Sequence, residues 1–122
     1  MRIITAAAVL VVGLMATACQ THEKGVKSNY MTQWSNVAAN TQVTTQAAQN
    51  VLHDEGLQDV KASSTRLDGT ASGHKADGTK VMVTVKKIGD AASEVSVNVG
   101  KMGDPAVGAE LAKKIKDRAE HP

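Results

Sequence analysis

The residue with the most specific chemistry is Cys19, the only cysteine among the 122 residues of the chain. Two small residues, Ala16 and Ala18, precede it and follow an apolar run over residues 3–15. A positively charged start, an apolar run and small residues before a cut site form the layout of a secretory signal peptide. We therefore expect a signal helix over residues 1–18, removed by cleavage between Ala18 and Cys19.

Two signal peptidases could cleave this bond, and they differ in whether the thiol carries lipid. Small residues at Ala16 and Ala18 suit ordinary secretion. The run Ala16-Thr17-Ala18-Cys19 also resembles the lipobox of bacterial lipoproteins, in which Leu is usual at the place of Ala16. A lone exposed thiol is unfavourable in an oxidising compartment, and no second cysteine can pair with it. We favour lipidation over plain secretion and over an uncleaved anchor.

Lipidation would give Cys19 a diacylglycerol on its sulfur and a further acyl chain, such as palmitate, on its new amino group. Two or more chains hold a protein stably on a bilayer. Gln20 is not the Asp that retains many lipoproteins in the inner membrane. We expect a place in the bacterial cell envelope, at the outer membrane facing the periplasm in preference to the inner membrane. Residues 19–28 predict a lipidated, flexible tether, and residues 29–122 predict one small domain.

The remaining residues with ligand or catalytic chemistry do not converge in the sequence. The consecutive residues His53-Asp54-Glu55 would point about 100° apart on a helix. Asp68, Asp77 and Asp90 each stand in a separate turn, whereas a calcium loop needs several closely spaced acidic ligands. His74 has no ligand partner nearby in the sequence. We therefore expect no catalytic residues, no metal site and no cofactor.

Composition limits both the core and the partners. The aromatic fraction is 2%, with no Phe, so the core must be built from Val, Leu, Ile, Ala and Met. The net charge of +2 is small, and no run of basic residues is present. We therefore expect no nucleic-acid partner, because such partners are bound through clustered positive charge.

Two helices are predicted, one in each half of the expected domain. Residues 41–55 carry an apolar stripe with helical spacing. Asn40 or Thr41 can cap its start, and Gly56 can end it in the left-handed conformation. The stripe consists of Val43, Ala47 and Val51, with Thr44, Ala48 and Leu52 beside them.

The second helix is expected to begin at Asp104-Pro105, since Asp is a good N-cap and Pro suits the first turn. Its stripe comprises Val107, Leu111 and Ile115, and its expected ion pairs are Glu110–Lys114 and Lys113–Asp117. A glycine-containing loop precedes it, but the Asp104 carboxylate occupies the place where an anion would bind.

Between the helices, alternating segments separated by Asp-Gly or Gly-Asp predict hairpins. We expect strands over residues 60–66, 70–75, 80–88 and 92–99. Residues 30–37 could form a strand or the first turns of a helix, and we favour the strand. Within the clearest pair, the valines at 81, 83 and 85 and those at 95, 97 and 99 share one face. The other face is polar, and is either wet or covered by a partner. Trp34 is expected in the core or at its edge.

Several motifs carry a family resemblance. They are Gly56-Leu57, Asp77-Gly78-Thr79-Lys80-Val81, Glu94-Val95-Ser96-Val97-Asn98-Val99-Gly100 and Gly103-Asp104. With the lipobox, they resemble an uncharacterised family of short bacterial lipoproteins, a domain of unknown function. The resemblance covers roughly residues 40–119 and departs near Asn98, where the family tends to carry Arg. It implies no catalytic or binding residues.

The predicted fold is α+β, with a four- or five-stranded antiparallel sheet, two helices packed on one face and the chain order (β)αββββα. The function we expect is that of a non-enzymatic, membrane-anchored lipoprotein that binds an envelope protein or polymer, or has a structural role. The alternative is a periplasmic small-molecule or metal-binding module that uses the polar sheet face, with a pocket lined by Met82, Trp34 and His74.

Overall fold

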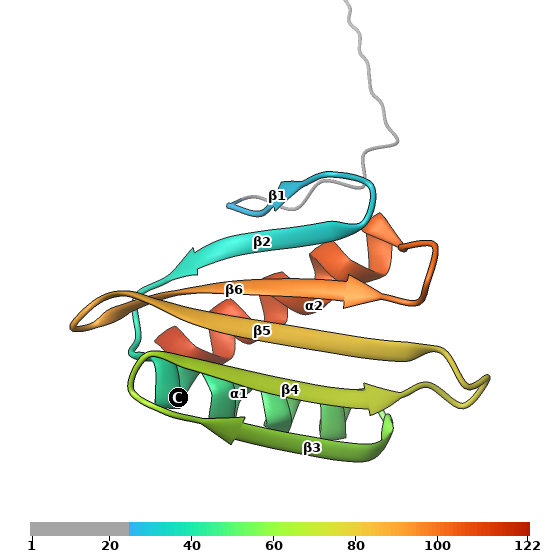
Figure 1. Ribbon diagram of the computed structural model, residues 1–122, viewed down its shortest axis with the longest axis horizontal. Helices are drawn as coiled ribbons and strands as arrows, with labels where there is room; N and C mark the ends of the chain where they lie inside the picture. The colour runs from blue at the N-terminus through green and yellow to red at the C-terminus, as the bar shows by residue number, and fades with distance from the viewer. Residues whose placement is uncertain (1–24) are drawn as a thin grey trace, which may run out of the picture.

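The computed structural model describes residues 25–122, which form one antiparallel sheet of six strands and two helices in the order ββαββββα (Figure 1). The strands are β1 (Lys27–Ser28), β2 (Thr32–Val37), β3 (Gln58–Ser64), β4 (Asp68–His74), β5 (Lys80–Gly89) and β6 (Ala92–Val99). The helices are α1 (Thr41–Asp54) and α2 (Pro105–Glu120). The predicted α+β class is confirmed, and the short β1 adds a strand to the expected sheet. The expected signal helix lies outside the described residues.

Both helices lie behind the same face of the sheet, as predicted (Figure 1). The strand order is β1-β2-β6-β5-β4-β3, so the long pair β5 and β6 lies in the middle. Helix α1 packs against β3 and β4, α2 packs against β2 and β6, and the two helices contact each other. The opposite face of the sheet is not covered by any helix of residues 25–122.

The core is a layer of valines between the sheet and the helices. The predicted inward valines of β5 and β6 are all buried, and they face one another across the register, as Val83 and Val97 do. Leu52 of α1 and Ile115 of α2 close the layer from the helix side. Each such side chain contributes about 1.5–3 kcal/mol by leaving water, so small β-branched residues can build this core without Phe.

The stripe of α1 differs from the prediction at its first turns. Val43 is 41% exposed, whereas Thr41, Thr44 and Thr45 are buried. Two of these threonines satisfy their hydroxyls: Thr44 Oγ1 lies 2.7 Å from Ser93 Oγ, and Thr45 Oγ1 donates to the carbonyl of Thr41 at 2.8 Å. The start of α1 therefore packs through threonine methyl groups, with hydroxyls bonded inside the layer. Of the two predicted caps, Asn40 and Thr41, the structure has Asn40 as the N-cap.

The polar, glycine-containing strand β4 has small residues because α1 and Leu57, which follows α1, lie close to it. A Cβ atom on Gly69 would overlap Thr45 Oγ1, and one on Gly73 would lie 3.1 Å from Leu57 Cβ. The predicted turn at residues 67–69 is shifted, because β4 already begins at Asp68 and the backbone N–H of Thr65 closes the turn on the Asp68 carbonyl at 2.7 Å.

The end of the expected tether belongs to the sheet. Val26 is buried, and β1 pairs with β2. Ser35 Oγ donates to the carbonyl of Gly25 at 2.7 Å, and Gln33 Nε2 donates to Ser28 Oγ at 2.9 Å. The prediction of a free tether is therefore wrong for residues 25–28, because polar side chains of β2 supply their partners.

Helix α2 begins as predicted, with Asp104 Oδ1 accepting the Val107 N–H at 3.2 Å. On its surface, Lys113 and Asp117 form the expected ion pair at 2.8 Å. Lys114 makes its direct ion pair with Glu55 after the end of α1, at 2.8 Å, and the charge of the expected partner Glu110 acts on it without such a contact. The Lys114–Glu55 ion pair therefore joins α2 to the end of α1.

Candidate functional site

The uncovered face of the sheet is a broad polar surface built by alternation. In β5 and β6, every second residue points away from the valine core, and β2 and β4 continue this pattern on either side. The central residues of this surface are Thr32, Trp34, Thr70, Ser72, Met82, Thr84, Glu94, Ser96 and Asn98. Most are hydroxyls or amides that can exchange hydrogen bonds with a partner at little desolvation cost.

Trp34 lies on this uncovered face and is half-buried, so the prediction that it lies in the core or at its edge is wrong. Alternation along β2 turns Gln33 and Ser35 inward instead, where each finds a hydrogen-bond partner in residues 25–29. Trp34 pairs across the sheet with Ser96 on one side and Lys27 on the other. The half-buried indole thus adds apolar surface beside Ser96 and Lys27, an arrangement suited to contact with a partner.

A groove of about 590 Å³ opens at one end of this face, between the β4–β5 turn and the end of β6. Its lining residues are Asp77, Gly78, Thr79, Lys80, Met82, Asn98, Gly100 and Lys101. Asn98 Oδ1 also accepts the Thr32 hydroxyl at 2.6 Å, which fixes the amide at the wall. The groove combines one thioether with charged and amide groups, so it can take a small polar ligand.

The residues named for a small-molecule or metal pocket share the uncovered face but not one pocket. Trp34 lies in the row of Ser96, while Met82 pairs with Asn98 and lines the groove. His74 pairs with Lys80. No group of His, Cys, Asp or Glu within residues 25–122 has the arrangement needed to hold a metal ion.

The isolated acidic residues act in their own turns. Asp68 Oδ1 accepts the Thr65 hydroxyl at 3.1 Å, and Asp77 Oδ1 accepts the Thr79 N–H at 2.9 Å. Hydrogen bonds from the side chain and backbone of Thr79 hold the pKa of the Asp77 carboxyl below its ordinary value. Asp90 lies 3.7 Å from its neighbour Lys87.

The sequence His53-Asp54-Glu55 lies at the end of α1, and its carboxylates bind α2 rather than a ligand. Asp54 pairs with Arg118 at 2.7 Å, in the same way that Glu55 pairs with Lys114. The hydrogen bond that Lys114 donates to Glu55 raises the pKa of Lys114. These contacts are exposed and hold the two helices side by side.

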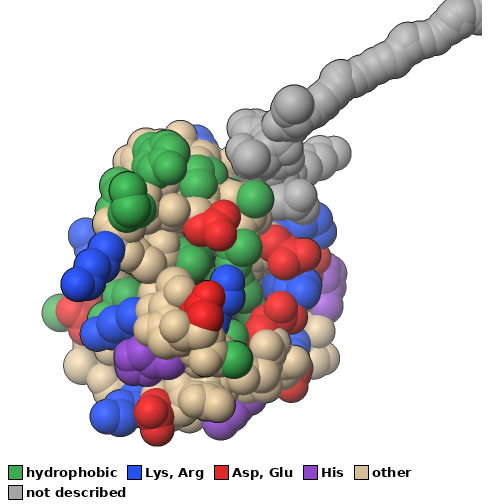
Figure 2. Space-filling view, turned by 90° about the vertical axis from the view of Figure 1, so that its right-hand side faces the viewer, with side chains coloured by type: hydrophobic (Ala, Val, Ile, Leu, Met, Phe, Trp, Pro, Cys, Tyr) green, Lys and Arg blue, Asp and Glu red, His purple; other side chains and the backbone are tan. Residues whose placement is uncertain are grey.

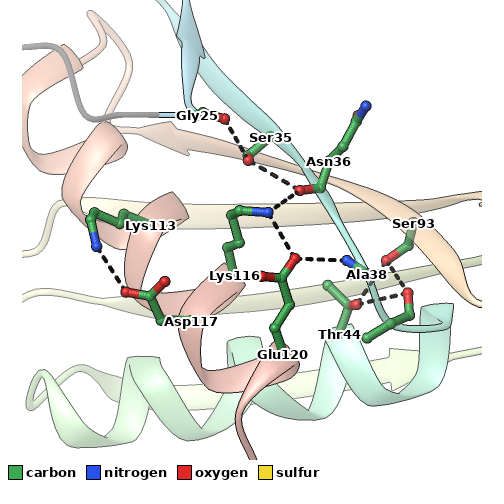
Figure 3. Close-up of polar contacts among 11 residues, drawn as sticks. Gly25, Ser35, Asn36, Ala38, Thr44, Ser93, Lys113, Lys116, Asp117 and Glu120 are labelled. Carbon is green, nitrogen blue, oxygen red and sulfur yellow. Dashed lines mark hydrogen bonds and ion pairs between the residues drawn. The ribbon is translucent and has the colours of Figure 1, made fainter.

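A cluster at the end of α2 fastens the edge of β2, and nothing in the sequence pattern predicts it (Figure 3). Lys116 Nζ donates to Glu120 Oε2 at 2.7 Å and to the carbonyl of Asn36 at 2.9 Å. The same Glu120 oxygen accepts the Ala38 N–H at 2.8 Å. The Lys116 hydrogen bond, followed by that from Ala38, holds the pKa of Glu120 below its ordinary value.

Apolar side chains are exposed at the end of the molecule where β1 turns into β2. Tyr30 is 67% exposed and Met102 is 78% exposed, and Met31 is also exposed. A Cβ atom on Gly103, the neighbour of Met102, would come within 2.6 Å of the Tyr30 carbonyl, so the two loops touch. Figure 2, which views this end, shows hydrophobic side chains gathered at its upper margin. We call Tyr30, Met31 and Met102 the apolar patch.

The proposed cleavage and lipidation residues, Ala18 and Cys19, lie outside the described residues. Neither helix within residues 25–122 has the length and apolarity needed to cross a lipid bilayer.

Comparison with known proteins identifies a family whose function is unknown. A family model described as protein of unknown function, DUF3568, matches residues 1–118. No curated protein matches the chain.

Proposed function

The chain belongs to the DUF3568 family, and we propose that it is a lipid-anchored, non-enzymatic protein of the bacterial cell envelope that binds a partner through its uncovered sheet face. The observation that supports the proposal is the position of Cys19, a few residues before the folded domain. The first described residues of that domain, 25–28, are bonded to the sheet. Lipid on the Cys19 sulfur and amino group would hold this domain at a membrane. The outer membrane, facing the periplasm, is the proposed location.

The distance from anchor to domain is short. The first described residue, Gly25, is bonded to the sheet, and residues 20–24 separate it from Cys19. At about 3.3–3.6 Å per residue, this segment spans at most roughly 20 Å between the two Cα atoms. The apolar patch begins only a few residues after Gly25, at Tyr30, within reach of the same membrane. A domain held this close presents its sheet face to partners in a restricted layer above the lipid.

Metabolic labelling tests the anchor. Cells that express the chain are grown with labelled palmitate and then fractionated, and the chain is expected to carry label and to separate with membranes. The variant Cys19→Ala removes the acceptor, so label and membrane association should both disappear. A variant that still carries the label would refute lipidation at Cys19.

The proposal that a partner binds the uncovered face of the sheet is tested by photo-crosslinking in intact cells. A photoreactive residue in place of Thr84, at the centre of the uncovered face, is expected to capture an envelope protein or polymer. The same residue in place of Gln46, exposed on α1, serves as the matched control. Equal capture from both positions, or capture from Gln46 alone, would place the partner elsewhere.

A second candidate function, a periplasmic small-molecule-binding module, is favoured by the groove beside Met82. A polar small ligand seated there would raise the thermal stability of the protein by mass action. A thermal-shift panel of metals, lipids and small metabolites tests it, with Met82→Lys as the blocked variant. A panel without any response, or one unchanged by Met82→Lys, would count against this module.

A further inference from the structure

A hollow of about 210 Å³ lies where α1 begins, at the end of the molecule opposite the apolar patch. Three segments that are distant in the sequence meet there: the start of α1, the β3–β4 turn and the β5–β6 turn, all at the left of Figure 1. The lining residues are Asn40, Thr41, Gln42, Arg66, Lys87, Gly89 and Asp90. The hollow lies outside the uncovered face of the sheet, and the family description gives it no role.

The first turn of α1 offers free donors to the hollow. Asn40 Oδ1 accepts the N–H of Val43 at 2.9 Å, so the side-chain cap uses one of the open backbone groups. The N–H groups of Thr41 and Gln42 have no hydrogen-bond partner among residues 25–122. The first turn holds no acidic residue, so the positive end of the helix dipole is not neutralised from within.

A buried hydroxyl is the second, independent sign of a ligand. Thr41 is only 2% exposed, and its Oγ1 has no hydrogen-bond partner within the described part of the chain. Thr41 also lines the hollow, so this buried, unused hydroxyl lies in its wall beside the free N–H groups. Buried polar groups are almost always paired, and an unpaired one calls for an occupant.

Two cations flank the hollow from other elements. Arg66 comes from the β3–β4 turn and Lys87 from the end of β5. The only acidic side chain in the lining is Asp90, which is fully exposed and lies 3.7 Å from Lys87 Nζ. Water screens such an exposed carboxylate, so it reduces the positive potential in the hollow without cancelling it.

We propose that this hollow binds a small oxyanion, in the form of inorganic phosphate or the phosphate group of an ester. Thr41 Oγ1 and the N–H groups of Thr41 and Gln42 donate to the anion, and Arg66 and Lys87 supply opposite charge. The contrast with α2 supports this assignment, because there Asp104 already places a carboxylate at the helix start. This site is separate from the proposed anchor and binding face, and each can stand without the other.

The test is a titration of the full chain, isotope-labelled in detergent micelles, with inorganic phosphate while the amide resonances are followed. Saturable shifts are expected at the amides of Thr41, Gln42 and Gly89. The variant Thr41→Val removes the hydroxyl at nearly constant shape and should weaken binding by about tenfold, as expected for a charge-assisted hydrogen bond. Thr41→Ser keeps the hydroxyl and should bind as the parent does. The absence of saturable shifts, or equal affinity in Thr41→Val, would overturn the proposal.

Charge variants separate this site from general attraction to lysines. Lys87→Gln is expected to weaken phosphate binding, whereas Lys61→Gln, an exposed lysine on β3, removes the same charge and should not. Asp90→Asn is expected to tighten binding. Equal losses in both lysine variants would show non-specific screening and refute the site.

The source of the phosphate group is decided by parallel titrations. Inorganic phosphate, glycerol phosphate and vesicles of phosphatidylglycerol are compared, with phosphatidylcholine vesicles as the control for lipid without net charge. Shifts of the same amides with the free phosphates indicate a soluble ligand, and shifts with phosphatidylglycerol alone indicate a lipid headgroup. A chain that responds to none of them does not have the proposed site.

Discussion

Gln33 is a fully buried amide that joins three parts of the chain. Its Nε2 donates to Ser28 Oγ at 2.9 Å and to the carbonyl of Asn29 at 2.8 Å. Its Oε1 lies against Gly108 of α2 and has no hydrogen-bond partner within residues 25–122. A glycine in α2 lets the helix approach this amide closely. One side chain of β2 therefore links the β1 segment to the core and to α2.

The variant Gly108→Ala tests this contact, because its methyl group would overlap Gln33 Oε1. Alanine favours a helix over glycine by about 1 kcal/mol, but overpacking a core costs about 1–3 kcal/mol, and Gln33 cannot move without losing its bonds to Ser28 and Asn29. We expect a net loss of up to about 2 kcal/mol in chemical denaturation, with faster amide exchange in β1. In the double variant with Gln33→Ala, the two losses should not add. Strictly additive losses would contradict the contact.

Glu120 makes stability depend on acid pH. Its pKa is held below the ordinary value of 4.5 by the hydrogen bond from Lys116 and then by that from Ala38. Folding therefore favours the charged carboxylate, so its contribution is complete above pH 4.5 and is lost as the pH falls through the lower folded-state pKa. Glu120→Gln should cost about 0.5–1 kcal/mol at neutral pH and should flatten the loss below pH 4.5. Denaturation at stepped pH measures this effect. Glu110→Gln, exposed on α2, is the control, and an equal change there would contradict the assignment.

At the scale of elements, the contact between α1 and β4 depends on Gly69. A methyl group there would overlap Thr45 Oγ1 in the buried layer. We expect Gly69→Ala to lower the free energy of unfolding by about 1–3 kcal/mol. Gly89→Ala is the matched control, because a Cβ there would lie 3.6 Å from its nearest neighbour, Ala92 Cβ, an ordinary contact. Thr45→Ala should relieve part of the Gly69→Ala loss. Similar losses in both glycine variants would contradict the contact with Thr45, because alanine without a clash should stabilise the chain by limiting its unfolded states.

The sequence predicts the elements better than it predicts their contacts. Alternating valines and the caps at Asn40 and Asp104 are local signals, and the structure confirms the strands and helices that they indicate. The inward faces of β2 and β4 could not be found in this way. Gln33 and Gly69 face the core only because of what lies opposite them, namely the β1 segment and Thr45.

The candidate sites follow the same rule. Cys19 is visible in the sequence because its motif is local, and its lipidation remains a proposal. The hollow at Thr41 joins three separate segments, so no spacing along the chain could indicate it. The size of Trp34, the largest apolar side chain, predicts a place in the core or at its edge, but alternation along β2 places it on the uncovered face. The inward direction of Gln33 and Ser35, which bond to Ser28 and Gly25, decides the direction of Trp34 here, and its hydrophobicity does not.

At the scale of the whole molecule, the short link to Cys19 restricts how the domain can lie on a membrane. The apolar patch lies at the turn that follows β1, and Lys27 and Lys101, both exposed, are near it in the chain. Exposed apolar side chains with an aromatic residue suit the lipid–water interface, and lysines suit anionic headgroups. In the lipidated protein, this end should therefore face the bilayer, and the hollow at α1 should face away from it.

This orientation is tested with a fluorophore attached to Met102→Cys after purification, because a lipidated Cys19 leaves no other thiol to react. On vesicles, the label at position 102 should be shielded from a water-soluble quencher and reached by a quencher placed in the lipid headgroups. The same label at Gln46→Cys on α1 should remain open to the aqueous quencher. Equal quenching at both positions would mean that the domain tumbles freely on its link. Stronger shielding at position 46 would mean that the helix side faces the membrane instead.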